Sequence, residues 1–322
     1  MKEDLIMKKI VALAMALCML LGCTAALAEE PTYKIGVVQL VQHVALDAAT
    51  QGFQDALTEL LGDRVTFDVQ NASGDAATCA TIANGFVAAD VDLIMANATP
   101  ALQAAYAATD SIPILATSIT DYGTALDDDN WTGVTGVNIS GTCDLAPLDQ
   151  QAQIIAELFP EAKNIGLIYC SAEPNSYYQV TTIAGYLAEL GFETTMYPFA
   201  DSNDLASVVQ SACDSADVLY IPTDNTAASY TETVYNVVQP AGKPVVAGEE
   251  GICAGCGVAT LTIDYYDLGY ATGKMAYEVL VNGADISAMP VEFAPQFTKK
   301  YNPTIAAELG IEIPADYEAI AE

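Results

Sequence analysis

Hydroxyl, amide and carboxylate side chains follow two long apolar runs of this sequence. The run 217–221 leads into Thr223, Asp224 and Asn225, and the run 92–96 leads into Asn97 and Thr99. Such groups can hydrogen-bond a small polar solute, and a carboxylate can pair with an ammonium group. Open parallel sheets bind ligands outside the carboxyl ends of their strands, so both turns are candidates for a binding edge.

The same reasoning applied to every predicted strand end gives a larger candidate ligand site. Taken singly, each residue suits an ordinary turn or cap, but together on facing edges they predict binding. The candidates are Gln39, His43, Asn97, Thr99, Thr120, Asp121, Glu173, Asn175, Ser176, Tyr177, Asp224, Asn225, Glu249, Asp264 and Tyr265.

The elements that position these residues occur twice along the chain. Segments 34–38 and 112–116 resemble segments 164–168 and 243–247 in sequence, at an offset of about 130 residues. This offset is about the size of one domain. The repeat predicts an α/β protein with two doubly wound, Rossmann-like lobes joined by a hinge. Residues 33–143 with about 266–294 form the first lobe, and 144–265 with about 295–322 form the second.

Basic residues are expected far from the cleft between the lobes. Arg64, Lys34, Lys163 and Lys243 stand at strand beginnings, which is the opposite edge of each sheet. Without a guanidinium to clamp an anion, the site favours a neutral, zwitterionic or cationic ligand.

An α-amino acid suits this division of charge. Its ammonium group would pair with Asp224, Asp121 or Glu173. Its carboxylate would be met by helix-start amides and hydroxyls. The hydroxyls are those of Thr99, Thr120 and Ser176, and the side chains expected to flank the ligand are His43, Tyr177 and Tyr265.

Signals for catalysis are absent. The sequence has no nucleophile elbow, no Walker loop and no dinucleotide glycine fingerprint, and its single histidine is His43. We therefore predict no catalytic residue, no cofactor and no metal site. An extracytoplasmic hydrolase that uses its carboxylate loops is the alternative from another class.

Charge excludes further partners. The formal net charge is -32, from 42 acidic and 10 basic residues. Such a surface repels nucleic acid and anionic lipid.

The amino terminus predicts export. A basic start at Lys8 and Lys9 precedes a short apolar stretch, as in a signal peptide covering residues 1–28. Two cleavage sites fit: a lipobox-like 20–23 that would leave a lipidated Cys23, which we favour, and ordinary cleavage before Glu29. Both place the protein outside the cytoplasm, as a lipoprotein or in secreted or periplasmic form, touching the membrane only through a lipid anchor.

Cys253 and Cys256 are expected in a glycine-rich loop. Packing, a local disulfide and a functional role all remain open, and we expect both thiols to be dispensable for binding. Local patterns also predict an N-cap at Thr99, a capping box of Ser176 with Gln179, a strand over 133–139 and a helix over 144–159.

These motifs together resemble the tryptophan/tyrosine-type substrate-binding proteins of ABC transporters, which have the periplasmic-binding-protein type I fold. The resemblance covers nearly all of the chain from Tyr33 onward. It is carried by 35–47, 96–100, Thr120 with Asp121, Glu173 with Asn175 and Ser176, 222–225, and 264–269. Val44 stands where the family pattern has proline.

The resemblance implies a transport function. A protein of this family captures a small solute between its lobes and delivers it to a membrane permease that a cytoplasmic ATPase drives. The implied ligands are amino acids, aromatic ones first. A ligand-sensing module for a membrane receptor is the second alternative.

Overall fold

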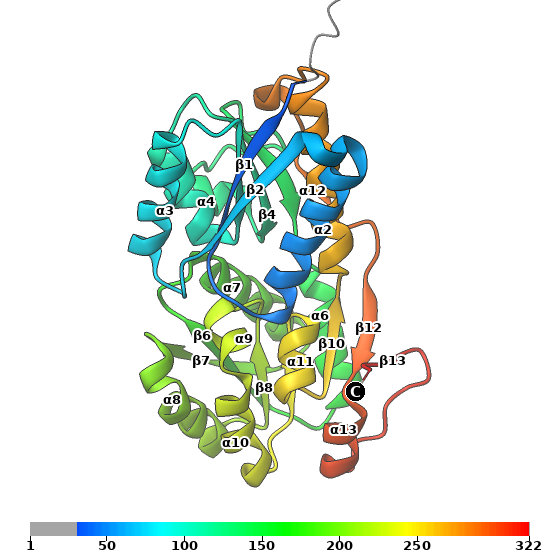
Figure 1. Ribbon diagram of the computed structural model, residues 1–322. Helices are drawn as coiled ribbons and strands as arrows, with labels where there is room; N and C mark the ends of the chain where they lie inside the picture. Colours follow the sequence, from blue (N-terminus) through cyan, green and yellow to red (C-terminus); the bar gives the residue numbers. More distant parts are fainter. Residues whose placement is uncertain (1–30, 322) are drawn as a thin grey trace, which may run out of the picture. The chain divides into compact units, whose positions relative to one another are not determined.

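The computed structural model describes residues 31–321, and the strands of this part of the chain form two sheets (Figure 1). The first sheet has the order β11-β5-β4-β3-β1-β2, and the second has β13-β12-β10-β9-β8-β6-β7. The order β2-β1-β3-β4 of the first sheet returns as β7-β6-β8-β9 in the second. This confirms the predicted α/β architecture with two repeated lobes.

All strand pairs of the first sheet are parallel. Its strands are β1 (Tyr33–Gln39), β2 (Val65–Asn71), β3 (Leu93–Asn97), β4 (Ile114–Ile119), β5 (Ile139–Cys143) and β11 (Glu292–Phe293). The helices that connect them are α2 (Val44–Leu61), the 3-10 turn η1 (Gly62–Arg64), α3 (Ala76–Ala88), α4 (Thr99–Ala108) and α5 (Tyr122–Leu126).

The second sheet is also parallel except where β12 pairs antiparallel with β10. Its strands are β6 (Asn164–Cys170), β7 (Glu193–Phe199), β8 (Val218–Ile221), β9 (Val245–Ala247), β10 (Ala259–Thr262), β12 (Thr298–Tyr301) and β13 (Glu318–Ala319). The remaining helices are α6 (Leu148–Leu158), α7 (Pro174–Glu189), α8 (Ser202–Ser215), α9 (Asn225–Ser229), α10 (Thr231–Ala241), α11 (Glu250–Cys256), α12 (Tyr265–Leu280), the 3-10 turn η2 (Ile286–Ala288) and α13 (Pro303–Leu309).

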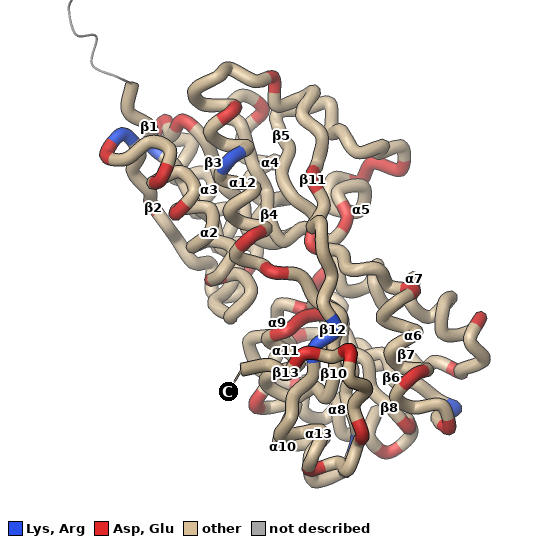
Figure 2. The backbone as a smooth tube through the Cα atoms, turned by 90° about the vertical axis from the view of Figure 1, so that its right-hand side faces the viewer, with Lys and Arg blue, Asp and Glu red and all other residues tan. Residues whose placement is uncertain are grey.

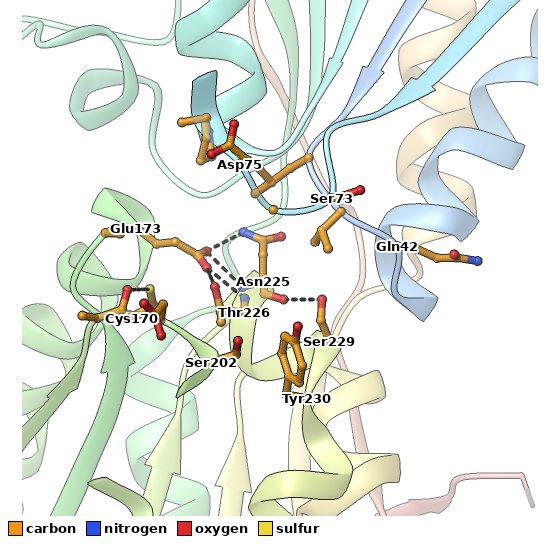
Figure 3. Close-up of a pocket in the computed structure, with 18 of the residues that line it drawn as sticks. Gln42, Ser73, Asp75, Cys170, Glu173, Ser202, Asn225, Thr226, Ser229 and Tyr230 are labelled. Carbon is orange, nitrogen blue, oxygen red and sulfur yellow. Dashed lines mark hydrogen bonds between the residues drawn. The ribbon is translucent and has the colours of Figure 1, made fainter. Parts of the chain in front are cut away.

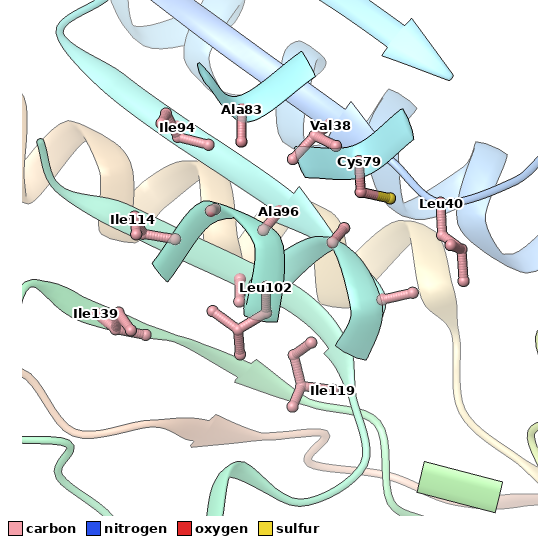
Figure 4. Close-up of a cluster of buried hydrophobic side chains, with 14 of the residues drawn as sticks. Val38, Leu40, Cys79, Ala83, Ile94, Ala96, Leu102, Ile114, Ile119 and Ile139 are labelled. Carbon is pink, nitrogen blue, oxygen red and sulfur yellow. The ribbon is translucent and has the colours of Figure 1, made fainter. Parts of the chain in front are cut away.

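Both faces of the first sheet are buried, as is usual for parallel sheets. On one face, Ile94 and Ile114 pack beneath α3 and α4 together with Leu102 (Figure 4). On the other face, Phe53 of α2 and Met275 of α12 cover the sheet. The strands are therefore packed from both sides, and this packing supports the residues that follow their carboxyl ends.

Helices α2 and α12 lie against each other through glycines. A Cβ atom on Gly269 would lie 1.9 Å from the Ala49 carbonyl oxygen, and one on Gly52 would lie 2.1 Å from that of Tyr266. Only glycine permits this approach. The contact holds Tyr265, the first residue of α12, close to the amino end of α2.

The chain passes between the two sheets three times within the described residues. It does so between β5 and α6, between β10 and α12, and between β11 and β12. The predicted lobe boundaries stay a prediction.

Two predicted caps are wrong. The N-cap of α4 is Ala98 rather than Thr99, and α7 has Glu173 as its N-cap with no side-chain cap, so the Ser176 capping box is absent. In α7 the physical reason is Pro174, which occupies the first helical position and places Ser176 inside the first turn.

Two predicted boundaries also move. The strand expected over 133–139 is found later in the chain, as β5 at 139–143. Gly133 and Gly136 have positive φ angles of 99° and 72°, which are not strand conformations, so the segment before β5 is not extended. The helix expected from residue 144 begins at Leu148, after Pro147.

Cys253 and Cys256 lie in helix α11, not in a loop. Gly255 of this helix packs closely against α10, since a Cβ there would lie 2.3 Å from the Thr231 hydroxyl oxygen. Both thiols are buried and free. They fill space in the second lobe beneath β9.

Candidate functional site

An enclosed cavity lies where the carboxyl ends of strands from both sheets meet. It is small, with a volume of about 10 Å³, which is room for about one water molecule. Its lining residues are His43, Leu46, Ser118, Thr120, Asp144, Asn175, Thr223, Asp224, Asn225, Ala228, Glu249 and Tyr265.

A second, larger cavity lies beside the enclosed one and shares Asn225 with it. Its volume is about 930 Å³, and residues of both lobes line it (Figure 3). Glu173 reaches into the wall between the two cavities, where it contacts Asn225.

Asp144 is the carboxylate that sequence reasoning missed. It follows β5 at the first crossing between the lobes, and only 5% of its surface is exposed. Its side-chain partners are two hydroxyl groups: Thr120 Oγ1 donates at 3.2 Å and the Tyr265 hydroxyl donates at 2.9 Å. Burial raises the pKa of Asp144 to about 6, against the smaller lowering by these two hydrogen bonds.

Asp224 and Glu173 build the turn between β8 and α9. Asp224 accepts hydrogen bonds from the backbone amides of Cys170 at 2.6 Å and Ala227 at 2.8 Å. Burial, together with the nearby charge of Glu173, raises the pKa of Asp224.

Glu173 belongs to the other strand end and reaches across to the same turn. It accepts from the backbone amides of Asn225 at 3.0 Å and Thr226 at 2.9 Å, and from both of their side chains. Two carboxylates thus complement the amino end of α9, where the helix dipole favours negative charge.

Glu249 plays the corresponding part after β9. It caps α11 by accepting from the backbone amides of Gly251, at 2.6 Å, and Ile252. It is 3% exposed, and burial raises its pKa to about 7.

His43 joins the two lobes. Its Nε2 lies 3.2 Å from Asn225 Oδ1. The Asn225 amide nitrogen donates to Glu173, so its oxygen faces the imidazole and the ring proton sits on Nε2. Burial lowers the pKa of His43, which makes the neutral ring the dominant form. Thr120 and Thr223 form a second link between the lobes, with 3.4 Å between their hydroxyl oxygens.

Two buried polar atoms in the cavity wall have no hydrogen-bond partner among the described residues. They are Ser118 Oγ and Asn175 Oδ1, in residues that are 6% and 4% exposed. Ser118 also has a positive φ of 57°, a backbone strain that is frequent at binding sites. Buried polar atoms are normally paired, so both point to a bound molecule.

Seven of the predicted site residues line the enclosed cavity. They are His43, Thr120, Asn175, Asp224, Asn225, Glu249 and Tyr265. The residues absent from the predicted set are Leu46, Ser118, Asp144, Thr223 and Ala228. Ser118 lies near the carboxyl end of β4 and Thr223 follows β8, so the strand-end signal was present in the sequence.

The other predicted residues lie behind or away from the cavity. Gln39 accepts a hydrogen bond from the Thr50 hydroxyl. Asn97 donates to the Thr50 hydroxyl oxygen and to the Leu46 carbonyl oxygen. Both residues therefore support the loop that carries His43. Tyr177 is 56% exposed.

Four predicted residues act within helix starts or the core. Asp121 accepts from the Thr124 amide at 2.7 Å, and Asp264 accepts from the Asp267 amide at 3.0 Å. Thr99 and Ser176 are buried and do not line the enclosed cavity.

Among the described residues, no lysine or arginine lines either cavity. Figure 2 shows where the lysines and arginines lie along the backbone. Lys299 pairs with Glu157 and Asp316, and Lys300 pairs with Glu250, all outside these walls. The described residues also contain no cluster of potential metal ligands. Within the same part of the chain, no helix has the length and apolar character needed to cross a bilayer.

The fold and this site define a two-lobed solute-binding protein of the type I periplasmic-binding-protein class. The family model for ABC transporter substrate binding proteins matches residues 34–322. The chain therefore belongs to the ABC transporter substrate-binding family, whose members bind solutes rather than transform them. The hydrolase alternative is thereby set aside.

Individual relatives agree with this assignment. A tyrosine-binding protein of Clostridioides difficile is 36% identical over 310 residues, which is 90% of this chain and 88% of that protein. A domain from Streptococcus pneumonia, solved in complex with L-Trp, is 35% identical with a TM-score of 0.86, covering 90% of this chain and 100% of that one.

A third relative differs in its arrangement. The ligand-free, open structure of a substrate-binding protein with adhesive properties from Clostridium difficile is 36% identical and covers 90% of this chain and 99% of its own. Its TM-score is only 0.68. At nearly equal identity, this chain thus superposes better on the L-Trp complex than on the open structure.

Proposed function

We propose that this protein captures an amino acid between its lobes, with aromatic amino acids preferred, and delivers it to an ABC permease powered by a cytoplasmic ATPase. The observation that carries the proposal is the buried Asp144 in a cavity whose described walls hold no lysine or arginine. The preference for aromatic ligands is supported by the printed descriptions of two relatives, a tyrosine-binding protein and an L-Trp complex.

The ligand's ammonium group pairs with Asp144. Among the carboxylates of the cavity wall, Asp224 and Glu249 already accept from backbone amides at helix starts, whereas the side chains that contact Asp144 offer only hydroxyl groups. Burial disfavours the ionised form of Asp144, and a bound ammonium group would favour that form through its opposite charge. This assignment replaces the earlier expectation that Asp224, Asp121 or Glu173 holds the ammonium.

The ligand's carboxylate lies at the amino end of α2. The N-cap of this helix, His43, makes no side-chain hydrogen bond to the first turn. The first amides of a helix have no intrahelical partners, so a carboxylate can accept from them. The Ser118 hydroxyl, which has no partner among the described residues, is a further donor at the same cavity.

Binding requires the hinge to move. The enclosed cavity of about 10 Å³ has no room for an amino acid, so the lobes must lie further apart in the ligand-bound form than in this structure. The better match to the L-Trp complex than to the open relative supports such a movement. The crossings between the sheets are the natural hinge positions.

We also propose that the protein works outside the cytoplasm, held to the membrane by a lipid on Cys23. This residue and the whole leader 1–28 lie outside the described residues. Protein from the native host should begin at lipidated Cys23 and partition into the detergent phase, whereas a free terminus at Glu29 in the culture fluid would contradict the anchor.

Calorimetry on ligand-stripped protein tests the function. The twenty amino acids are titrated one by one, and tryptophan, tyrosine or phenylalanine should bind most tightly. If no amino acid binds while a sugar, a nucleoside or a dianion binds tightly, the proposal is wrong.

A further inference from the structure

The free acceptor in the enclosed cavity is a defined atom. The Asn175 amide nitrogen lies 3.1 Å from the Thr223 carbonyl oxygen and 3.4 Å from Glu173 Oε2. Both neighbours only accept, so this end of the amide must be the donor. The oxygen Oδ1 is therefore the buried atom without a partner, and a ligand that satisfies it must donate a hydrogen bond.

The ionisable groups around this acceptor are acidic and include no cation. Asp144, Asp224 and Glu249 line the same cavity, burial raises the pKa of each, and the one imidazole, His43, is neutral. Its ring proton is directed at Asn225, so it offers the ligand no cation. An ammonium group entering here would meet carboxylates and a free carbonyl oxygen. A carboxylate would meet the same negative groups and only neutral donors.

We propose that the ammonium group is the dominant recognition element and that the cavity also binds primary arylalkylamines, which have the aromatic side chain and the amine but no carboxylate. This inference rests on the proposed function and deepens it. In the bound state, Asp144 forms the ion pair and Asn175 Oδ1 accepts a second N–H of the same ammonium group.

The carboxylate of an amino acid contributes less. The hydrogen-bond donors for this carboxylate are the first backbone amides of α2 and the Ser118 hydroxyl. The acidic groups Asp144 and Glu249 lie in the same cavity and oppose its binding when they are ionised. The net effect of the ligand's carboxylate on affinity is the difference between this hydrogen bonding and this repulsion. Removing the carboxylate removes the repulsion along with the hydrogen bonds.

Three matched ligands test the proposal on the unaltered protein. They are the preferred aromatic amino acid, its decarboxylated amine (tryptamine for tryptophan, tyramine for tyrosine), and its deaminated acid (3-indolepropionate or 3-(4-hydroxyphenyl)propionate). We expect the amine to bind within about tenfold of the amino acid, and the acid to bind at least about 100-fold more weakly, as for loss of a buried charged pair. Calorimetry at pH 7.5 gives all three values.

The outcomes separate the inference from the function. If the amino acid binds and the amine does not, the inference is wrong and the proposed function stands. If the deaminated acid binds as well as the amino acid, the inference is wrong as well. If no aromatic amino acid binds, the proposed function itself fails.

Two variants locate the effect. Asn175→Leu removes the acceptor at similar volume and should weaken the amine and the amino acid by the same factor. Ser118→Ala should weaken the amino acid and leave the amine unchanged. Equal losses for both ligands in Ser118→Ala would contradict the assignment. The ligand series above stands even if a variant fails to fold.

Discussion

The turn after β8 and the crossing after β5 both place carboxylates at the same cavity, yet their surroundings differ. In the β8 turn, Asp224 and Glu173 accept hydrogen bonds from backbone amides and so take part in building helix α9. At the crossing, Asp144 has two hydroxyl groups as its side-chain partners and caps no helix. The first pair is part of the fold, whereas Asp144 is the carboxylate that we propose for pairing with the ligand.

The largest effect on stability should follow from Glu173→Ala. This change leaves the amides of Asn225 and Thr226 without their acceptor, and we expect a loss of about 3 kcal/mol in the free energy of unfolding. Urea unfolding of ligand-free protein measures it. Glu189→Ala, at an exposed position of the same helix α7, is the control and should change little. Equal stability of the two variants would contradict the structural role of Glu173.

The next effect concerns pH and is shared by the two kinds of carboxylate. Burial raises the pKa of Asp144 to about 6 and that of Glu249 to about 7, above their values near 4 in the unfolded chain. Each protonated group therefore contributes stability at low pH, and this contribution is lost as pH rises through the folded pKa. The melting temperature of ligand-free protein should fall from pH 5 to pH 8.

A bound ammonium reverses this trend, because it stabilises the ionised form of Asp144. The rise in melting temperature on adding ligand should therefore be larger at pH 7.5 than at pH 5.5. In Asp144→Asn the difference between these two pH values should shrink. A ligand-induced shift that is independent of pH in the unaltered protein would contradict an ionised Asp144 as the ammonium partner.

The smallest effect should come from the link between the lobes. His43→Ala removes a neutral hydrogen bond to Asn225, worth about 1 kcal/mol, and should weaken ligand affinity about fivefold through faster release. Val44→Ala, at a 72% exposed neighbour, is the control. Stopped-flow release rates distinguish them, and equal rates would show that His43 does not hold the closed form.

Much of the fold could be predicted, because the apolar runs 92–96 and 217–221 end abruptly at polar residues and recur at one spacing. That pattern identified the paired strands and seven of the residues lining the cavity. The roles within the site could not be predicted. Glu173 reaches the amides of residues more than fifty positions away, and no local pattern records this contact.

Asp144 was missed for a related reason. The glycines at 133 and 136 hid the position of β5, so residue 144 was taken as the start of a helix rather than the polar end of a strand. Its importance also depends on burial by Tyr265 and on the absence of a nearby cation, and both are properties of the folded chain.

The most direct test of the account is the affinity of Asp144→Asn for the preferred amino acid at pH 7.5, measured by calorimetry beside its melting temperature without ligand. We predict that the affinity falls at least about 30-fold, since removing one partner of a buried charge pair costs about 2–5 kcal/mol, while the ligand-free protein melts at the same temperature or higher. An unchanged affinity in a folded variant would contradict the central claim that Asp144 receives the ligand's ammonium group.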